Sequence, residues 1–334
     1  MRRFLALTAF FLALVFFAFG VFAYNKIENF QNMQPTVASM AAKDAVYLLV
    51  GVDRASYSSD VIMLVRVENG ALSILQIPRD SLTKEGSRLN ATFAAACNRV
   101  KNEGGDDRAA YAAGGRALAD KLSRALGVTV NAHATMTLNG LSTLVDAIGG
   151  VEVTLDTPIS YEGRDGQTVT LSAGKVTLDG GAAEGLVRCR KAYPDADYGR
   201  MRAQRRFIEG VFEKLRTSFS PLAMFSLFRR AYSEVETDLA FKDALPLMKL
   251  FMEDDVRPTF ATLVGAYYRH NKAAVEVLNE KNLEKASQYL GGDFNKADAR
   301  AVFYPEAKEA QKLYESVTPP PFTVSGERSK HENQ

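Results

Sequence analysis

Residues 4–23 form the longest hydrophobic segment of the chain and contain no charged side chain. A run of this length is enough for a helix to cross a bilayer. Two arginines precede it, and because basic residues stay on the cytoplasmic side, we expect residues 1–3 in the cytoplasm and the rest of the chain outside the cell. A cleaved secretory signal peptide is the competing interpretation. We favour an uncleaved, single-pass cell-membrane anchor, followed by a stalk over residues 24–44.

From residue 45 onward, the spacing of apolar residues changes repeatedly between the periods of strands and helices. A continuous apolar run over residues 46–50 predicts a buried strand. Residues 61–67 and 72–77 predict two more strands, which the tight-turn pair Asn69-Gly70 joins as a hairpin. Helical spacing predicts helices over residues 91–97, 108–126, 141–148, 182–186, 200–217, 221–232, 238–252 and 282–290, with Asn90 as the N-cap of the first. Strand patterns follow over 133–138, 151–155, 186–190 and 257–264, with a hairpin over 161–171.

The periodicity ends near residue 305. Three consecutive prolines at 319–321 and a polar end predict that residues 305–334 form a flexible tail. The globular domain is therefore expected over residues 45–304.

Composition excludes a nucleic-acid partner and gives no sign of a histidine metal site. The formal net charge is only +2, and no helix-turn-helix pattern is present. The three histidines are far apart in sequence and lack metal-ligand spacing. Cys97 and Cys189 form no C-x-x-C motif, so a disulfide between them and two separate buried thiols both stay open.

Arginine is concentrated in residues 185–206, in contrast to the balanced charge elsewhere. If residues 186–190 form a strand, Arg188 and Arg190 share one face and Cys189 points to the other. If a helix begins near Arg200, Gln204 shares its face. Guanidinium groups bind two phosphate oxygens at once, so these side chains could converge on a polyanion. A solvated basic surface is the alternative.

Acidic residues follow two of the predicted strands. Asp53 and Asp60 flank one loop at the end of a buried strand, and two such carboxylates could bind a magnesium-like ion. Aspartates in loops also serve as turn formers and helix caps, which is the alternative. Arg79 and Asp80 follow another strand, as a structural ion pair or as part of a site, because α/β sheets bind ligands at strand ends.

As an ordered set, seven stretches resemble the LytR-CpsA-Psr family of bacterial cell-envelope proteins. No single stretch is decisive, but they occur in the family's order. They are L-L-V-G-V-D at 48–53, S-D-V-I-M-L at 59–64, I-P-R-D-S at 77–81, R-L-N-A at 88–91, L-V-D-A-I-G-G-V-E-V at 144–153, V-R-C-R-K at 187–191, and D-Y-G-R at 197–200 with Gln204. The expected domain organisation, a single N-terminal membrane span followed by an exported domain, also resembles that of the family.

The resemblance implies a three-layer α/β/α domain with a central mixed sheet and a motif core over residues 46–215. It also implies a phosphotransferase that moves a glycopolymer, such as teichoic acid or capsule, from a polyprenyl pyrophosphate carrier to peptidoglycan. The implied cofactor is Mg²⁺, with Mn²⁺ as a substitute. The implied partners are the lipid-linked glycopolymer, peptidoglycan and the membrane.

The resemblance also implies roles for individual residues. Asp53 and Asp60 inherit the metal-binding role. The pyrophosphate contacts fall to Arg79, Arg88, Arg188, Arg190, Arg200 and Gln204. Asp80 and Asp197 are the acids best placed to orient arginines or to take a proton from the acceptor hydroxyl, and they complete a catalytic set with Arg79, Arg188 and Arg190.

The chain departs from the family pattern at two positions. Ser58 stands where the family usually has an arginine, and Arg54 in the same loop could supply that charge. Arg88 stands where the family usually has a lysine, which keeps the charge but changes its geometry. The first departure leaves room for a rival function, in which the protein binds polyprenyl phosphate as a non-catalytic envelope or regulatory protein.

Overall fold

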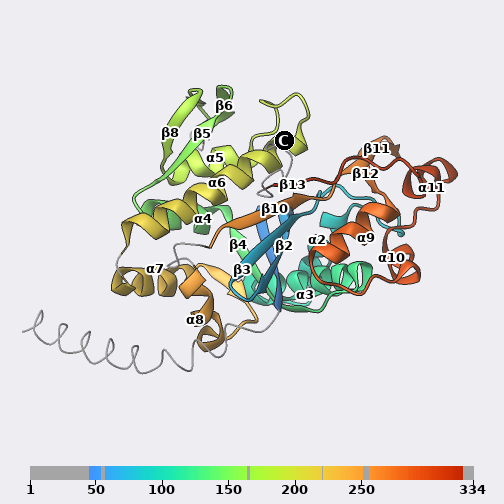
Figure 1. The fold of residues 1–334 in the computed structure, drawn as a ribbon, viewed down its shortest axis with the longest axis horizontal. Helices are drawn as coiled ribbons and strands as arrows, with labels where there is room; N and C mark the ends of the chain where they lie inside the picture. Colours follow the sequence, from blue (N-terminus) through green and yellow to red (C-terminus); the bar gives the residue numbers. More distant parts are fainter. Residues whose placement is uncertain (1–44, 54–56, 164–165, 220, 251–255, 326–334) are drawn as a thin grey trace, which may run out of the picture. The chain divides into compact units, whose positions relative to one another are not determined.

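A seven-stranded mixed sheet lies at the centre of the fold (Figure 1). Its strand order is β13-β10-β3-β2-β1-β4-β9, in which β1 runs parallel to β4 and β3 runs parallel to β10. The strands are β1 (Ala45–Asp53), β2 (Ser58–Glu68), β3 (Ala71–Gln76), β4 (Val130–Thr137), β9 (Val235–Thr237), β10 (Pro258–Thr262) and β13 (Val324–Ser325). The predicted strands over 46–50, 61–67 and 72–77 are confirmed, and Asn69 and Gly70 both have the positive φ of the expected tight turn.

This computed structural model describes residues 45–53, 57–163, 166–219, 221–250 and 256–325. They belong to one compact unit, Lys43–Gln334. Within these ranges, every helix is too short or too polar to cross a membrane. The predicted membrane span and stalk lie outside the described residues.

Helices cover both faces of the sheet, which confirms the expected α/β/α layers. One core joins β1, β2 and β3 to α2 (Leu89–Asn102), α3 (Asp107–Leu126), α9 (Glu280–Tyr289) and α10 (Lys296–Phe303). On the other face lie α4 (Leu138–Ala147), α6 (Asp197–Ser218), α7 (Pro221–Ser233) and α8 (Phe241–Leu250). The predicted helices therefore exist, although α2 is longer and α8 shorter than expected.

The two faces explain why residues 46–50 are continuously apolar. Val46, Leu48 and Val50 point into the core with α2 and α3. Tyr47 and Leu49 point to the opposite face, where Leu49 keeps 38% of its surface exposed. Both faces of this strand therefore meet apolar surroundings, but only one is closely packed.

Three two-stranded sheets accompany the main sheet. β5 (Val151–Leu155) pairs with β8 (Gly174–Leu178), and β6 (Ile159–Glu162) pairs with β7 (Thr168–Leu171), as the hairpin prediction for 161–171 requires. The third consists of β11 (Gly265–His270) and β12 (Ala273–Leu278). It was not predicted, whereas the strand predicted over residues 257–264 is confirmed as β10.

The predicted flexible tail is also wrong over residues 305–325. This segment forms α11 (Lys308–Tyr314) and β13, which pairs with β10. The Tyr314 side chain is fully buried, and Asn279 donates hydrogen bonds to the carbonyls of Leu313 and Ser316, at 3.1 and 2.9 Å. A few buried side chains and the hydrogen bonds of Asn279 hold this segment in place. Because these positions show no extended apolar periodicity, the sequence pattern did not reveal them. Residues 326–334 lie outside the described residues.

Cys97 and Cys189 are free thiols, so the disulfide alternative is excluded. Each is buried in a different core, Cys97 beside α3 and Cys189 beside α5 (Gly180–Arg188). The expectation for Asn90 is corrected as well. Arg88 occupies the N-cap position of α2, and the backbone N–H of Asn90 donates to the Arg79 carbonyl at 3.0 Å.

Candidate active site

Charged side chains gather at one edge of the main sheet. Because β2 runs antiparallel to β1 and β3, the end of β1, the start of β2 and the end of β3 meet at this edge. Asp60 comes from β2, Arg79 and Asp80 from the loop after β3, and Asp197 and Arg200 from the first turn of α6. Residues from three of the stretches that resemble the family, 59–64, 77–81 and 197–200, therefore lie at the same end of the sheet.

A β-bulge sets the position of Asp60. Val61 pairs with Gly51 and Ser59 pairs with Val52, which leaves Asp60 as the extra residue of β2. Its carboxylate forms an ion pair with the Arg79 guanidinium and accepts a hydrogen bond from Ser58 Oγ at 3.2 Å. Its backbone carbonyl accepts from Arg200 Nη2 at 3.1 Å. The bulge thus gives Asp60 partners from both the β3 loop and α6.

The loop after β3 is rigidly held. Ser81 Oγ donates to the Pro78 carbonyl at 2.6 Å inside the protein. Asp80 lies between two arginines, with Oδ2 at 3.8 Å from Arg79 Nε and Oδ1 at 3.3 Å from Arg88 Nη1. Arg88 also donates to the carbonyl of Ala274 in β12 at 2.9 Å. Arg79, Asp80 and Arg88 therefore lie together, as predicted.

Arg200 lies behind this cluster rather than on its surface. Its side chain is only 2% exposed, and Nη2 lies 2.7 Å from Asp197 Oδ1. Burial lowers the pKa of Arg200, while Asp197 acts in the opposite direction. Burial likewise raises the pKa of Asp197, opposed by Arg200 and Arg79. The geometry gives Arg200 a positioning role, because it ties the start of α6 to the bulge of β2.

The predicted strand at residues 186–190 is wrong. α5 continues to Arg188 because the Asp179 side chain caps its start, accepting from the Ala182 N–H at 2.8 Å, and its apolar side packs in a core. Cys189 is nevertheless buried while Arg188 and Arg190 are exposed, so the predicted separation of the faces survives.

The two exposed arginines have different surroundings. Arg190 lies near enough to Asp197 and Arg200 to influence both electrostatically. Arg188 is 51% exposed and pairs with Glu184 at 3.3 Å, one turn earlier in α5. Gln204 is buried and donates from Nε2 to the Val187 carbonyl at 3.0 Å, so it holds the helix end that carries both arginines.

The metal site expected from the sequence would comprise two carboxylates, those of Asp53 and Asp60. Asp53 is the last residue of β1 and pairs with Ser58 of β2. Ser58 precedes Asp60 by two residues, so the two aspartates lie at the same end of the strand pair. Among the described residues, no group of three histidine, cysteine or acidic side chains could hold a metal ion. Two carboxylates still fit Mg²⁺, because this ion commonly takes one or two from the protein and its other ligands from water and substrate phosphates. Arg54 lies outside the described residues.

Several buried polar atoms at the site have no hydrogen-bond partner within the described part of the chain. They are Nε of Arg79, Nε of Arg200, Oδ1 of Asp80 and Oδ1 of Asp197, and the two oxygens lie in ion pairs with Arg88 and Arg200 that do not meet hydrogen-bond geometry. Buried polar groups are normally satisfied, and exceptions concentrate where a ligand completes the network. Two of these atoms are guanidinium donors, which suits an anionic ligand.

Glu276 of β12 also belongs to this cluster and was missed by sequence reasoning. Its backbone N–H donates to the Asp80 carbonyl at 3.0 Å, and its Oε2 accepts from the Tyr198 hydroxyl at 3.0 Å. Burial raises the pKa of Glu276 to about 7, with Asp197 and Asp80 adding to the rise and the Tyr198 hydrogen bond opposing it. The sequence offered one indication of this role, because Glu276 is the single acidic residue within the apolar stretch A-V-E-V-L at 274–278.

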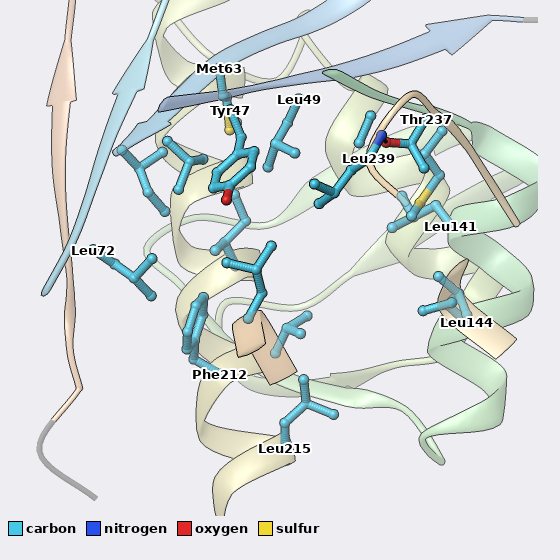
Figure 2. A pocket seen from close by; sticks show the side chains of 18 of the residues that line it. Tyr47, Leu49, Met63, Leu72, Leu141, Leu144, Phe212, Leu215, Thr237 and Leu239 are labelled. Carbon is cyan, nitrogen blue, oxygen red and sulfur yellow. Dashed lines mark hydrogen bonds between the residues drawn. The ribbon is translucent and has the colours of Figure 1, made fainter. Parts of the chain in front are cut away.

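An apolar cavity of about 460 Å³ lies on the α6 face of the sheet (Figure 2). Side chains from the sheet, α4 and α6 point into it, among them Tyr47, Leu49, Met63, Leu72, Leu141, Leu144, Phe212 and Leu215. Met63 is three residues along β2 from Asp60, a separation of about 10 Å in a strand. The cavity therefore begins within about 10 Å of the charged cluster.

The backbone is strained where the chain enters α6. Ala196 has φ 44° and ψ −97°, which side-chain-bearing residues rarely adopt. Replacing Ala196 by glycine is expected to raise the free energy of unfolding by about 1 kcal/mol, because the relieved strain exceeds the extra flexibility of the unfolded chain. Urea unfolding of both proteins measures the difference; an equal or lower stability of Ala196→Gly would contradict the strain.

Comparison with known proteins identifies the group to which this arrangement belongs. TagU of Enterococcus faecalis, named a polyisoprenyl-teichoic acid–peptidoglycan teichoic acid transferase, is 29% identical over 261 residues, covering 74% of this chain and 79% of the relative. Biofilm regulatory protein A of Streptococcus mutans is 27% identical over 329 residues, covering 90% and 78%.

The fold is also that of a solved structure described as TagT bound to LIIa-WTA. It superposes with a TM-score of 0.57 at 22% identity, over 75% of this chain and 91% of that chain. A model of the LytR_cpsA_psr family matches residues 19–290. Since this match spans most of the sequence, the chain belongs to the LytR_cpsA_psr family.

Proposed function

We propose that the protein is a membrane-anchored phosphotransferase that moves a glycopolymer from a polyprenyl pyrophosphate carrier to peptidoglycan. The observation that carries this proposal is the position of the arginine cluster at one end of an apolar cavity, joined to it by β2 and α6. A lipid-linked pyrophosphate has the same two parts in the same order, a charged group followed by a long apolar chain. The relative TagU bears the name of such a transferase.

In this proposal the cavity holds the first part of the polyprenyl tail. Phe207 begins the α6 lining seven residues after Arg200, or about 10 Å along a helix. The predicted anchor over residues 4–23 would keep the domain at the membrane, where the carrier resides. Residues 207–215 line the cavity, whereas residues 109–126 of α3 pack in the core on the opposite face.

The arginines act on the pyrophosphate. Attack by an acceptor hydroxyl on the phosphorus that bears the glycopolymer breaks the bond from that phosphorus to the bridging oxygen, and negative charge develops on the leaving polyprenyl phosphate. Arg79 and Arg190 stabilise this charge, while Asp60, Asp80 and Asp197 hold the guanidinium groups in place. Mg²⁺ held by Asp53 and Asp60 would supply further stabilisation of phosphate charge.

A carrier-binding envelope regulator that transfers nothing is the second candidate. The relative named Biofilm regulatory protein A and the substitution of Ser58 for the usual arginine favour it. The Ser58 hydroxyl is neutral, so this position contributes no positive charge to the cluster. Ser58 Oγ donates to Asp60 and lies 3.5 Å from Asn90 Nδ2. Turnover of a lipid-linked substrate separates the two candidates.

The test uses the full chain in detergent with a polyprenyl-pyrophosphate-linked saccharide, a peptidoglycan fragment and Mg²⁺. Released polyprenyl phosphate and the joined product are measured by mass spectrometry. Arg190→Ala is expected to slow release at least about 100-fold, and Arg188→Ala less, because Arg188 is held by Glu184. Addition of EDTA should also stop release.

Arg124→Ala is the matched control, since it removes an exposed arginine that pairs with Asp298 on the far side of the main core. It should release polyprenyl phosphate at the unmodified rate. Tight binding of the carrier without release by the unmodified protein would contradict the transferase and favour the regulator.

A further inference from the structure

Glu276 differs from the other acids of the site in its partners. The carboxylates of Asp60, Asp80 and Asp197 each pair with at least one arginine. Glu276 has no arginine partner among the residues that the structure describes, and its carboxylate instead accepts from a neutral hydroxyl, that of Tyr198. Of these four acids, Glu276 is therefore the one that forms no ion pair among the described residues.

We propose that Glu276 accepts the proton that the acceptor hydroxyl loses when it attacks the pyrophosphate, an inference that rests on the proposed transferase function. The position of Glu276 is well defined. Tyr198 Oη accepts from the Gly265 N–H at 2.9 Å while donating to Glu276, so β11, β12 and α6 are joined at this point. The backbone of Glu276 is bonded to the loop of Asp80 and Leu82, which fixes its distance from Arg79.

The surroundings of Glu276 match the needs of a proton acceptor. From α6 it faces Tyr198 and Asp197, and from the β3 loop it faces Asp80. Burial and the two acids bring its pKa to about 7, and a base whose pKa lies near the working pH combines an adequate ionised fraction with adequate basicity. Asp80 and Asp197 instead form ion pairs with Arg88 and Arg200, and those contacts occupy their carboxylates.

The step balances as follows. The oxygen of the acceptor hydroxyl forms a bond to the phosphorus that bears the glycopolymer, and the bond from that phosphorus to the bridging oxygen breaks. The electron pair of the broken bond leaves with the polyprenyl phosphate. The hydroxyl proton passes to the Glu276 carboxylate and is then lost to solvent.

The pH dependence of turnover tests the inference. The unmodified full chain should release polyprenyl phosphate faster as the pH rises through about 7, because Glu276 must be ionised to act. Glu276→Gln should lower the rate by about 100-fold or more and remove this rise. Its affinity for the carrier, measured by titration calorimetry, should stay within about 3-fold, as the carrier is bound by arginines. Glu284→Gln, at an exposed position on α9, is the matched control and should keep both rate and pH profile.

Tyr198→Phe provides a second variant that keeps the carboxylate. In the unmodified protein, the hydrogen bond from the Tyr198 hydroxyl lowers the pKa of Glu276. Loss of this bond should shift the rise of the pH profile to higher pH, while turnover at high pH persists. Glu276→Gln with an unchanged rate and profile would overturn the proton-acceptor role and leave the transferase intact. Absence of release by the unmodified protein at every pH would overturn both.

Discussion

Replacing Arg79 by alanine is expected to reduce polyprenyl phosphate release at least about 100-fold. Arg79 contacts Asp60 and Asp80 and lies near Asp197 and Arg200, so it is the arginine with the most partners in the cluster. Its Nε is buried without a hydrogen-bond acceptor in the described structure, which leaves a donor for the pyrophosphate. Release is followed by mass spectrometry as above.

Loss of Arg79 also leaves Asp60 without its cation, so a loss of fold must be distinguished from a loss of chemistry. Arg79→Ala combined with Asp60→Asn removes both charges and should regain thermal stability without regaining activity. Arg79→Lys keeps the charge without the fork and should retain intermediate activity. Normal turnover by a folded Arg79→Ala protein would contradict the assignment of the pyrophosphate site.

Replacing Tyr314 by alanine is expected to lower the free energy of unfolding by roughly 3–5 kcal/mol, as for other large aromatic side chains removed from a core. Tyr314 is fully buried and packs edge-on against Tyr304, with ring centroids 5.3 Å apart. Chemical denaturation of the purified chain measures the loss. If residues 305–325 were a flexible tail, the substitution would have no effect.

Tyr314→Phe is the matched control. The hydroxyl of Tyr314 is buried and has no hydrogen-bond partner in the described structure, so its removal should be neutral or slightly stabilising. A chain that ends at Ser325 keeps the α11 and β13 contacts and should match the unmodified stability. A chain that ends at residue 304 lacks them and should unfold far more easily.

Most strands of the sheet and several residues of the charged cluster could be predicted from the sequence, because they depend on local patterns. The run over 46–50, the Asn69-Gly70 turn and the amphipathic α6 each follow from residues close together in the chain. The family resemblance implied one site for Arg79, Asp80, Asp197 and Arg200, and the structure brings these residues together.

What the sequence could not supply depends on tertiary context. Arg188 is helical because a cap at Asp179 and a buried face outweigh the strand-like local pattern. Glu276 enters the site only because β12 pairs with the loop after β3, two segments separated by almost two hundred residues. The buried state of Arg200 likewise requires the Asp60 carbonyl, whose position is set by a bulge rather than by any motif.

The open face of β1 has a consequence for the life of the protein in the cell. Leu49 and its neighbours border an apolar space that the described residues leave open, so on the proposed function the carrier completes a core. Mass action then couples folding to supply, since carrier at 100 times its dissociation constant would add about 2.7 kcal/mol to stability. When the carrier is depleted, a larger fraction of the chain would open and be degraded by proteases, so the amount of transferase would follow the amount of its substrate.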